Sequence, residues 1–277
     1  MIDARLARRR FERAAASYAK ASRLESEIGA RMLERLDYVK LAPRRVLDAG
    51  SGPPQRALGK RYPAAEVIAF DFALGMLRIG KKRFLERSPP KAVCGDFMRL
   101  PLAPASIDLV WSNMALHWAA DPLAALREFH RVLAPGGLLM FSALGPDTLA
   151  ELRAAAGAAR VHAFADMHDL GDMLLAAGFA EPVMDMERLT LVYADGAALL
   201  ADLRASGQTS ARADRARGLA GRGFLADLHA RLARQARNGK LPVSFEAVYG
   251  HAWRAAGRRE ASRTADGRSI VQFERRR

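Results

Sequence analysis

Cysteine, aromatic side chains and long apolar runs are all scarce in this sequence of 277 residues. The single cysteine, Cys94, excludes a disulfide scaffold and a zinc site built from cysteines. No stretch approaches the roughly 18 apolar residues that a membrane-spanning helix needs. The first residues lack the apolar segment of a secretory signal, and Asp3 and Glu12 argue against a mitochondrial presequence. We therefore expect a soluble, cytoplasmic protein.

Basic charge is abundant and unevenly distributed. The net charge is +14, and residues 201–277 carry 17 Lys or Arg against 7 Asp or Glu. Such an excess can attract nucleic acid, an anionic membrane or an acidic protein, or it can be an ordinary solvated face. The sequence contains no zinc finger, aromatic RNA-binding pair or other nucleic-acid motif. We expect neither a nucleic acid nor a membrane as a partner.

Strand-like and helix-like segments alternate from residue 44 onward, and half of all residues are hydrophobic, which is enough for a sizeable core. The predicted strands are residues 44–48, 66–71, 91–94, 106–113, 138–142, 182–193 and 243–253. The predicted helices are residues 55–61, 74–84, 122–133, 149–156 and 169–177. This alternation predicts an α/β fold, with a mostly parallel sheet and helices on both faces.

Three segments frame this pattern. Apolar residues at helical spacing predict an N-terminal helical arm over residues 1–43, which could fold over a ligand as a lid. We assign the main domain to residues 44–257 and interpret the Arg-rich stretch at about 196–240 as a helical insertion into it. Residues 258–277 form a basic, polar tail.

The first strand-to-helix turn contains Asp48, Gly50 and Gly52. Glycines let the backbone approach a ligand closely at the carboxyl end of a strand. A dinucleotide fingerprint would need a further glycine where Gln55 stands. Asp48 would repel a pyrophosphate but would suit a cofactor that carries positive charge. The turn therefore favours S-adenosylmethionine over NAD.

Two further acids follow the next predicted strands. Asp71 lies 19 positions after Gly52, in the range where an acid meets ribose hydroxyls. Asp96 can accept a hydrogen bond from an adenine amino group, and the adjacent Phe97 can pack against the ring. Each acid alone is more often a helix cap or a turn residue. Their joint placement at the ligand-binding edge of the sheet favours a ligand site.

Together these motifs resemble the class I S-adenosylmethionine-dependent methyltransferases over residues 44–145. Residues 106–113 and 131–137 add to the match. The resemblance implies a Rossmann-like sheet with an antiparallel last strand and S-adenosylmethionine as methyl donor. The cofactor-binding residues that it implies are Asp48, Gly50, Ser51, Gly52, Asp71, Phe72, Met76, Asp96, Phe97, Ser112 and Asn113.

Segments outside that core match one family more closely. Residues 11–18, 112–118, 145–153, 166–172 and 245–253 resemble the malonyl-acyl-carrier-protein O-methyltransferases of biotin biosynthesis. Those enzymes methylate the free carboxylate of a malonyl thioester on acyl carrier protein, and the methyl ester primes pimeloyl synthesis. Three alternatives remain: a methyltransferase for another acceptor, an arginine hydroxylase like the sister family that assembles respiratory complex I, or a non-catalytic binding module.

The sequence departs from the methyltransferase pattern at Pro54, where a third glycine is usual. Proline has no N–H to donate to a cofactor. We interpret Pro53 and Pro54 as the opening of the next helix, where proline is tolerated; the alternative is weakened cofactor binding or lost catalysis. Glu25 also stands where the family resemblance predicts a glutamine.

A malonyl carboxylate is ionised at neutral pH, so its methylation requires no general base. Placing the oxygen near the methyl group and excluding water can suffice. Our candidates for contact with the acceptor are Tyr18 in the arm, His117 after the fourth strand, and Arg153, whose guanidinium could hold the malonyl group. The alternative for each is an ordinary packing, rim or surface residue.

Histidines and acids also occur together at His162, Asp166 and His168. We expect no metal there, because Asp166 and Asp169 suit the start of a helix and a third ligand is not evident.

The resemblance gives the basic insertion a specific interpretation. Acyl carrier proteins are acidic, so charge complementarity could dock one against it. The candidate docking residues are Arg212, Arg215, Arg217 and Arg222. We expect the protein to act as a monomer.

Overall fold

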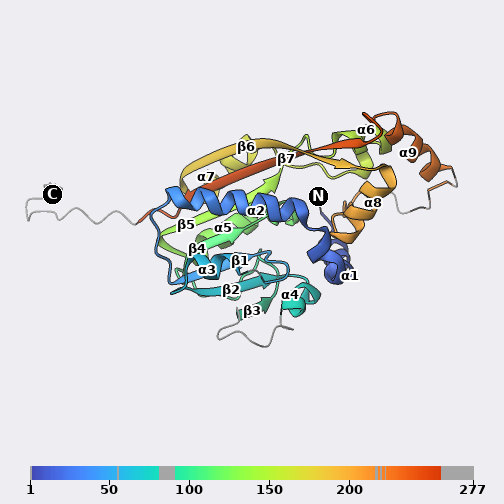
Figure 1. Ribbon diagram of the computed structural model, residues 1–277. Coiled ribbons are helices and arrows are strands. Elements are labelled where there is room, and N and C mark those ends of the chain that lie inside the picture. The colour runs from blue at the N-terminus through green and yellow to red at the C-terminus, as the bar shows by residue number, and fades with distance from the viewer. Residues whose placement is uncertain are drawn as a thin grey trace, which may run out of the picture.

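A sheet of seven strands runs through the computed structural model, which describes residues 2–256 apart from residues 55, 81–90, 216, 217, 219 and 222 (Figure 1). The strand order is β3–β2–β1–β4–β5–β7–β6. The strands are β1 Arg45–Ala49, β2 Glu66–Asp71, β3 Lys91–Cys94, β4 Ile107–Ser112, β5 Leu133–Leu144, β6 Ala180–Tyr193 and β7 Leu241–Trp253. Only β7 runs antiparallel to its neighbours, β5 and β6. The predicted sheet with an antiparallel last strand is confirmed.

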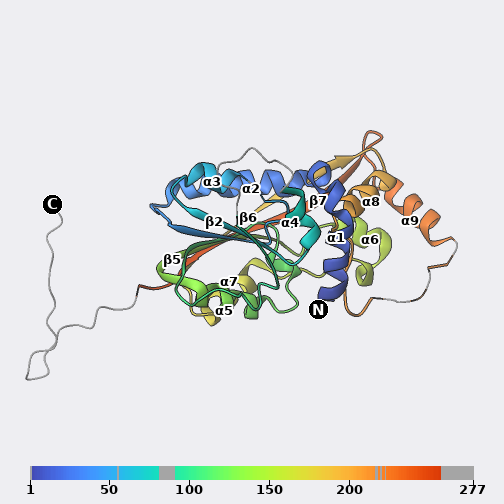
Figure 2. The same ribbon diagram turned by 90° about the horizontal axis from the view of Figure 1, so that it is seen from below.

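Helices lie on both faces of the sheet. The α-helices are α1 Ala4–Ala21, α2 Arg23–Arg35, α3 Ala57–Arg61, α4 Leu74–Gly80, α5 Pro122–Val132, α6 Ala150–Ala156, α7 Met167–Ala176, α8 Gly196–Ala205 and α9 Phe224–Ala233. Short 3₁₀ turns are η1 Leu36–Tyr38, η2 Leu116–Trp118 and η3 Ala158–Arg160. Figure 2 shows α2 and α3 over one face of the sheet and α5 and α7 over the other. None of the described helices is both long and apolar enough to cross a bilayer.

Local sequence explains the central elements. β1 is buried along four of its five residues, as expected for an apolar strand covered on both faces. α5 begins where the side chain of Asp121 accepts a hydrogen bond of 3.1 Å from the Ala124 N–H. Pro122 occupies the first turn, where its missing N–H carries no penalty.

Apolar side chains form a core on each face of the sheet. On one face Ile28 and Met32 of α2 pack over the strands, and both are fully buried. On the other face Phe129 of α5 and Leu174 of α7 are also fully buried. These two layers hold the carboxyl ends of the strands in fixed positions.

The arm docks against both the main domain and the insertion, since α1 packs on α4 and on α8. The side chain of Glu12 accepts a hydrogen bond of 2.7 Å from the N–H of Gly75, at the start of α4. On the other side, the Ser17 hydroxyl donates to the carbonyl of Ala205 at 2.8 Å, and the Asp3 N–H donates to the carbonyl of Ala211 at 2.8 Å. The arm therefore joins two parts of the chain that are distant in sequence.

Several predicted boundaries differ from the structure. The predicted helical arm contains two helices, which meet at Ser22. β5 begins at Leu133 rather than at residue 138, because Leu133 pairs with Ile107 before an irregularity in the register. α3 begins at Ala57, so Pro53 and Pro54 lie in the preceding loop and do not open the helix.

The predicted insertion at residues 196–240 is only partly helical. Its described residues between α8 and α9 are not helical. The predicted tail over residues 258–277 lies outside the described residues, as does the end of the predicted helix over residues 74–84.

Candidate functional site

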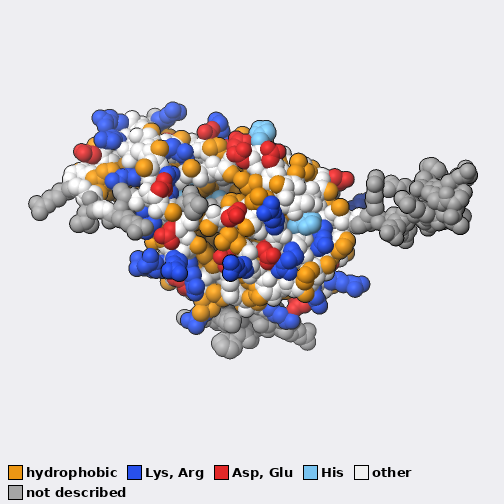
Figure 3. Space-filling view, turned by 180° about the vertical axis from the view of Figure 1, so that it is seen from behind, with side chains coloured by type: hydrophobic (Ala, Val, Ile, Leu, Met, Phe, Trp, Pro, Cys, Tyr) orange, Lys and Arg blue, Asp and Glu red, His pale blue; other side chains and the backbone are white. Residues whose placement is uncertain are grey.

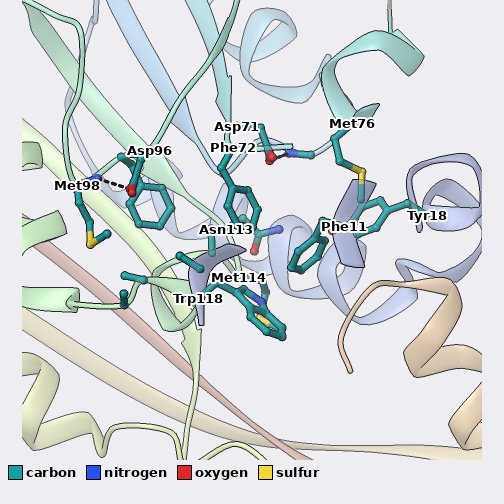
Figure 4. A pocket seen from close by; sticks show the side chains of 17 residues that line it. Phe11, Tyr18, Asp71, Phe72, Met76, Asp96, Met98, Asn113, Met114 and Trp118 are labelled. Carbon is teal, nitrogen blue, oxygen red and sulfur yellow. Dashed lines mark hydrogen bonds between the residues drawn. The ribbon is translucent and has the colours of Figure 1, made fainter. Parts of the chain in front are cut away.

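A cavity of about 660 Å³ lies at the carboxyl ends of β1, β2, β3 and β4. Figure 4 shows Asp96 and Met98 at one end of this sheet-edge cavity and Tyr18 and Met76 at the other. Its described lining is Ala4, Phe11, Tyr18, Gly50, Gly52, Asp71, Phe72, Met76, Asp96, Phe97, Met98, Asn113, Met114, Ala115, Trp118, Ala119 and Ala120.

The glycine turn after β1 requires glycine for two reasons. Gly50 has φ +77° and Gly52 has φ +59°, in the left-handed region that other residues rarely adopt. A Cβ atom on Gly50 would also lie 2.2 Å from the Cβ of Ala115. The turn is fixed to the neighbouring strand, because the Gly50 N–H donates to the carbonyl of Phe70 at 2.8 Å. The turn thus needs glycine for its conformation, and its close approach to a ligand stays a prediction.

The carboxylate of Asp71 is held by two backbone N–H groups. Gly52 donates to it at 2.9 Å and Ala73 at 2.7 Å. These bonds lower the pKa of Asp71, but burial outweighs them and raises that pKa to about 6. The bonds orient a carboxylate that retains lone pairs for the hydroxyls of a ligand.

Asp48 and Glu25 line a neighbouring cavity of about 800 Å³, which we call the glycine-loop cavity. It shares Tyr18, Gly50 and Asn113 with the sheet-edge cavity and also contains Ser51. Burial raises the pKa of Asp48 to about 7, and the nearby Asp71 acts in the same direction. Burial likewise raises the pKa of Glu25 to about 7, although the Gln208 amide donates a hydrogen bond to it.

Three buried acids thus face two adjoining cavities whose described lining contains no Lys or Arg. Buried carboxylates need a cationic or hydrogen-bonding partner to remain ionised. S-adenosylmethionine carries an ammonium, a sulfonium and a ribose diol, so this donor set fits it. A pyrophosphate would face repulsion at the same place.

Tyr18 reaches this site from α1. Burial raises the pKa of its phenol well above 10, and Glu25, Asp71 and Asp48 add to the rise. Tyr18 is therefore a neutral hydrogen-bonding group. Its ring lies over the glycine turn, since a Cβ on Gly52 would be 3.5 Å from Cε1 of Tyr18.

The other end of the sheet-edge cavity is apolar and aromatic. Phe97 lines it and packs on Phe129, with ring centroids 5.6 Å apart. Asp96 accepts a hydrogen bond of 2.9 Å from the Met98 N–H and is exposed. It therefore shapes the turn that presents Phe97 and Met98, and one of its oxygens remains available to an adenine amino group.

Ser112 ends β4 and Asn113 follows it, but the two side chains have different environments. Asn113 lines both cavities; its Nδ2 donates to the Glu25 carbonyl at 2.8 Å, and its Oδ1 accepts from the Ser142 hydroxyl at 2.9 Å. Ser112 is fully buried and lines neither cavity, and among the described residues its hydroxyl has no partner. Asn113 forms the floor, and Ser112 lies beneath it.

His117 is a partly buried, neutral imidazole. Its Nδ1 accepts a hydrogen bond of 3.4 Å from the Leu144 N–H, which leaves the proton on Nε2. Burial lowers the pKa of His117 to about 3, and His162 adds to this effect. Nε2 is buried and has no partner among the described residues. His117 lines a separate cavity with His162 and Phe164, adjacent to the sheet-edge cavity through Ala119 and Ala120.

Arg153 lines neither of the two cavities that the acids face. Its guanidinium donates to the carbonyl of Thr148 at 3.0 Å and to that of His162 at 3.5 Å. These bonds tie the turn before α6 to the segment before α7. The guanidinium of Arg153 thus binds backbone carbonyls, whereas we expected it to hold the malonyl group.

The acids and histidines considered for a metal have other partners. The side chain of Asp166 caps α7 by accepting from the His168 N–H at 2.8 Å. His162 accepts from the Ala211 N–H at 2.9 Å through Nε2. Within the part of the chain that the structure describes, no group of three His, Cys, Asp or Glu could hold a metal ion.

Phe11 and Trp118 belong to the site although they were not among its predicted residues. Both line the sheet-edge cavity and pack edge-to-face, with ring centroids 5.1 Å apart. Trp118 packs in the same way on His162 at 5.0 Å. Both residues lie in segments that carry the closer family resemblance, residues 11–18 and 112–118. That resemblance was the signal in the sequence that could have indicated their place in the site.

The predicted docking arginines are engaged locally where the structure describes them. Arg212 pairs with Asp214 at 2.6 Å, and Arg215 pairs with Asp3 at 3.2 Å. Arg217 and Arg222 lie outside the described residues. On the face in Figure 3, basic side chains are interspersed with acidic ones.

Comparisons with known proteins place these features in context. Residues 47–141 match a family model described as a methyltransferase domain. The malonyl-[acyl-carrier protein] O-methyltransferase of Methylovorus sp. (strain MP688) is 50% identical over 288 residues, covering 99% of this chain and 95% of that protein. The protein of the same name from Laribacter hongkongensis is 49% identical, covering 95% of this chain and 93% of that protein.

Solved structures share the fold at lower identity. The YcgJ protein of Bacillus subtilis superposes with a TM-score of 0.59 at 19% identity, covering 82% of this chain and all of that one. Phosphoethanolamine N-methyltransferase 2 of Haemonchus contortus, in complex with S-adenosyl-L-methionine, has a TM-score of 0.56 at 14% identity, covering 88% of this chain and 57% of that one.

Proposed function

The chain belongs to the malonyl-[acyl-carrier protein] O-methyltransferase family, and we propose that it methylates the free carboxylate of a malonyl group carried by acyl carrier protein. It is an S-adenosylmethionine-dependent methyltransferase with the class I fold. The product is the malonyl methyl ester that primes pimeloyl and biotin synthesis. The names of the relatives do not favour another methyl acceptor or arginine hydroxylation. They do not favour a non-catalytic binding module either.

The observation that carries the proposal is the cluster of buried acids around the glycine turn. Asp48, Asp71 and Glu25 face one site, and no basic side chain of its described lining offsets them. A cationic methyl donor supplies the missing positive charge. When bound, S-adenosylmethionine presents a methyl group on a sulfonium, and this group is transferred to an oxygen as the S–C bond breaks.

Different side chains of the protein would bind different parts of the donor. Asp71 would accept from the ribose hydroxyls, because two N–H groups already orient it. Phe97 and Met98 would pack on the adenine, with Asp96 beside them. Asp48 and Tyr18 would face the methionine end, where the positive charge lies.

No residue at the site needs to remove a proton. The acceptor is already a carboxylate, and the lowered pKa of His117 keeps its imidazole neutral. Tyr18 and His117 can each donate a hydrogen bond to an acceptor oxygen without forming an ion pair with it. A neutral donor leaves the attacking oxygen more nucleophilic than a guanidinium would. Arg153 would position the turn before α6 rather than hold the acceptor directly.

Exclusion of water is the other contribution of the protein. Phe11 of the arm and Trp118 close the cavity on the side of α1, and both are buried. A dry site strengthens the electrostatic interactions around the charged donor and protects the reacting groups.

Intact-protein mass spectrometry would test the reaction. Malonyl-acyl carrier protein is incubated with the protein and S-adenosylmethionine, and acetyl-acyl carrier protein serves as the matched control. We expect one methyl group on the malonyl form and none on the acetyl form. No transfer by well-folded protein that binds S-adenosylmethionine would refute malonyl-acyl carrier protein as the acceptor.

A further inference from the structure

A further cavity of about 820 Å³ lies beside the site and has no role in the mechanism above. Trp118 lines both this cavity and the sheet-edge cavity, so one indole separates them. Its walls come from α6, η3, α8 and α9. We call it the insertion cavity, and its described lining is Trp118, Leu144, Leu149, Leu152, Ala156, Arg160, Val161, His162, Phe164, Leu200, Leu203, Arg204, Gln208, Thr209, Ser210, Phe224 and Leu228.

Two kinds of wall line the insertion cavity. Most of the lining is aliphatic or aromatic, including Leu152 and Leu203, which are buried. One strip, residues 208–210, is polar. Within it the hydroxyl of Ser210 is buried and has no hydrogen-bond partner among the described residues. The side chains of this strip carry one amide and two hydroxyl groups, so this wall suits the polar part of a ligand.

Two arginines stand where the insertion cavity opens. Arg160 and Arg204 both line it, and both are exposed, so they lie at its rim. Arg160 stacks on the Phe224 ring, with the guanidinium carbon 3.9 Å from the ring centroid. Within the described part of the chain neither arginine forms an ion pair. Both guanidinium groups are therefore available to an anion.

We propose that the insertion cavity receives the phosphopantetheine arm of the malonyl carrier, with the arm's phosphate at Arg160 and Arg204 and its thioester end toward Trp118. The inference rests on the proposed function, because it supplies the route by which that acceptor reaches the donor. The arm has an apolar dimethyl group, two amides and one anionic end. The apolar walls, the polar strip at Ser210 and the arginines at the rim match these groups.

The position of the arginines assigns them to the phosphate rather than to the reacting carboxylate. Methyl transfer requires the carboxylate to approach the donor, on the far side of Trp118 from the rim. A carboxylate paired with an exposed rim arginine would stay away from the methyl group. The rim is instead where the arm leaves the protein and joins the carrier, and its phosphate is at that end.

Two small substrates isolate the phosphate. Malonyl-phosphopantetheine carries it and malonyl-pantetheine lacks it, while the reacting end is identical. We expect the wild-type KM for malonyl-phosphopantetheine to be lower by about tenfold, because a charge-assisted contact at a partly exposed site is worth about 1.4 kcal/mol. In the Arg160→Gln, Arg204→Gln double variant the ratio of the two KM values should fall to about one by the same argument.

The matched control is Arg127→Gln, an exposed arginine of α5 on the opposite face of the sheet, which should keep the wild-type ratio. Equal KM values for the two substrates in the wild type would overturn the inference while leaving the proposed function intact. Failure of the wild type to methylate any malonyl thioester would instead refute the proposed function.

A second variant tests the cavity itself. Ala156 lies at the end of α6 and lines the cavity, so Ala156→Phe would place a ring inside it. We expect KM for both substrates to rise at least about fivefold, while the affinity for S-adenosylmethionine, measured by calorimetry, stays within twofold because the donor cavity is separate. Unchanged KM values would overturn the inference. The preserved donor affinity shows that the variant is folded.

Discussion

The backbone N–H of Gly52 donates a hydrogen bond of 2.9 Å to the carboxylate of Asp71. These residues lie 19 positions apart, at the ends of two neighbouring strands. The bond joins the glycine turn to the acid that faces the donor, so each keeps the other in place. The two halves of the donor site are thus coupled before any ligand arrives.

Replacing Asp71 by asparagine should test this coupling. An asparagine can accept from one of the two N–H groups, but its amide N–H₂ would face the other, and the negative charge is lost. We expect the affinity for S-adenosylmethionine to fall by about 10- to 100-fold, as for the loss of a charged hydrogen-bond acceptor. Calorimetric titration measures it, with Asp172→Asn on the exposed face of α7 as the matched control. Unchanged affinity in folded Asp71→Asn would contradict the assigned role.

Asp48→Asn should separate function from stability. The pKa of Asp48 is about 7 in the folded protein, above its ordinary value of 3.8. A carboxyl group with a raised folded-state pKa destabilises the fold progressively as the pH rises from about 4 to about 7. At pH 8 the variant should therefore be more stable than wild type, by up to about 4 kcal/mol of unfolding free energy. It should also unfold at a higher temperature. Its affinity for S-adenosylmethionine should nevertheless fall.

Differential scanning calorimetry at pH 8 and at pH 5 measures the first effect. At pH 5 wild-type Asp48 is already protonated, so the difference in unfolding temperature should shrink. A variant that is less stable than wild type at pH 8 would argue against a buried, uncompensated carboxylate at this position.

Donor binding should depend on pH with a defined sign. Asp48 and Glu25 have pKa values of about 7 and Asp71 of about 6, so all three protonate as the pH falls below neutrality. A cationic donor binds the ionised acids, and its Kd should therefore fall as the pH rises from about 5 to about 7. Titrations in buffers of different ionisation enthalpy should also detect protons released on binding. A Kd that is constant over this range would contradict the prediction.

His117→Gln tests whether the imidazole acts as a base. The pKa of His117 is about 3, so it does not titrate between pH 5 and 8. Glutamine can present an N–H near the position of Nε2. We expect the variant to lose activity by no more than about tenfold, as for one neutral hydrogen bond. The shape of its pH–rate profile should match that of wild type, and the disappearance of an inflection near neutrality would show that His117 had carried a proton.

Gly50→Ala and Gly136→Ala form a matched pair. Both glycines have a positive φ, +77° and +79°. A Cβ at Gly50 meets Ala115 at 2.2 Å, whereas a Cβ at Gly136 meets nothing within 4 Å. Gly136→Ala should cost about 1 kcal/mol of unfolding free energy from backbone strain alone. Gly50→Ala should cost at least about 2 kcal/mol, because it adds a steric clash. Chemical denaturation measures both, and equal losses would show that the turn can relax around the clash.

The sequence predicts the sheet well, and it places the candidate donor-site acids near strand ends, because strand ends and turn residues are local features. Asp48, Gly50, Asp71 and Asp96 each stand at a strand end that periodicity alone could locate. Family resemblance supplied the antiparallel β7, since nothing in a strand's own residues fixes its direction. The extent of β5 was missed because Pro135, normally a strand breaker, lies at a register irregularity.

Residues whose roles depend on long-range contacts were harder to predict. Arg153 was a reasonable candidate for an anion, but the carbonyls that it binds become its neighbours only when the segments before α6 and α7 meet. The insertion cavity arises between four elements that no single motif links. Arg160 and Arg204 therefore had no signal that distinguished them from the other arginines in the sequence.

The contacts between the arm and the insertion also determine when the site can be completed. They join residues that are 188 to 212 positions apart, such as Ser17 with Ala205 and Asp3 with Arg215. During synthesis α1 leaves the ribosome before the main domain, but its docking partners in the insertion emerge only after β1 to β6. Contacts of such long sequence separation form late and slowly. The nascent chain can thus pair β1 to β5 early, while β7 and a closed donor site must both await synthesis of the insertion.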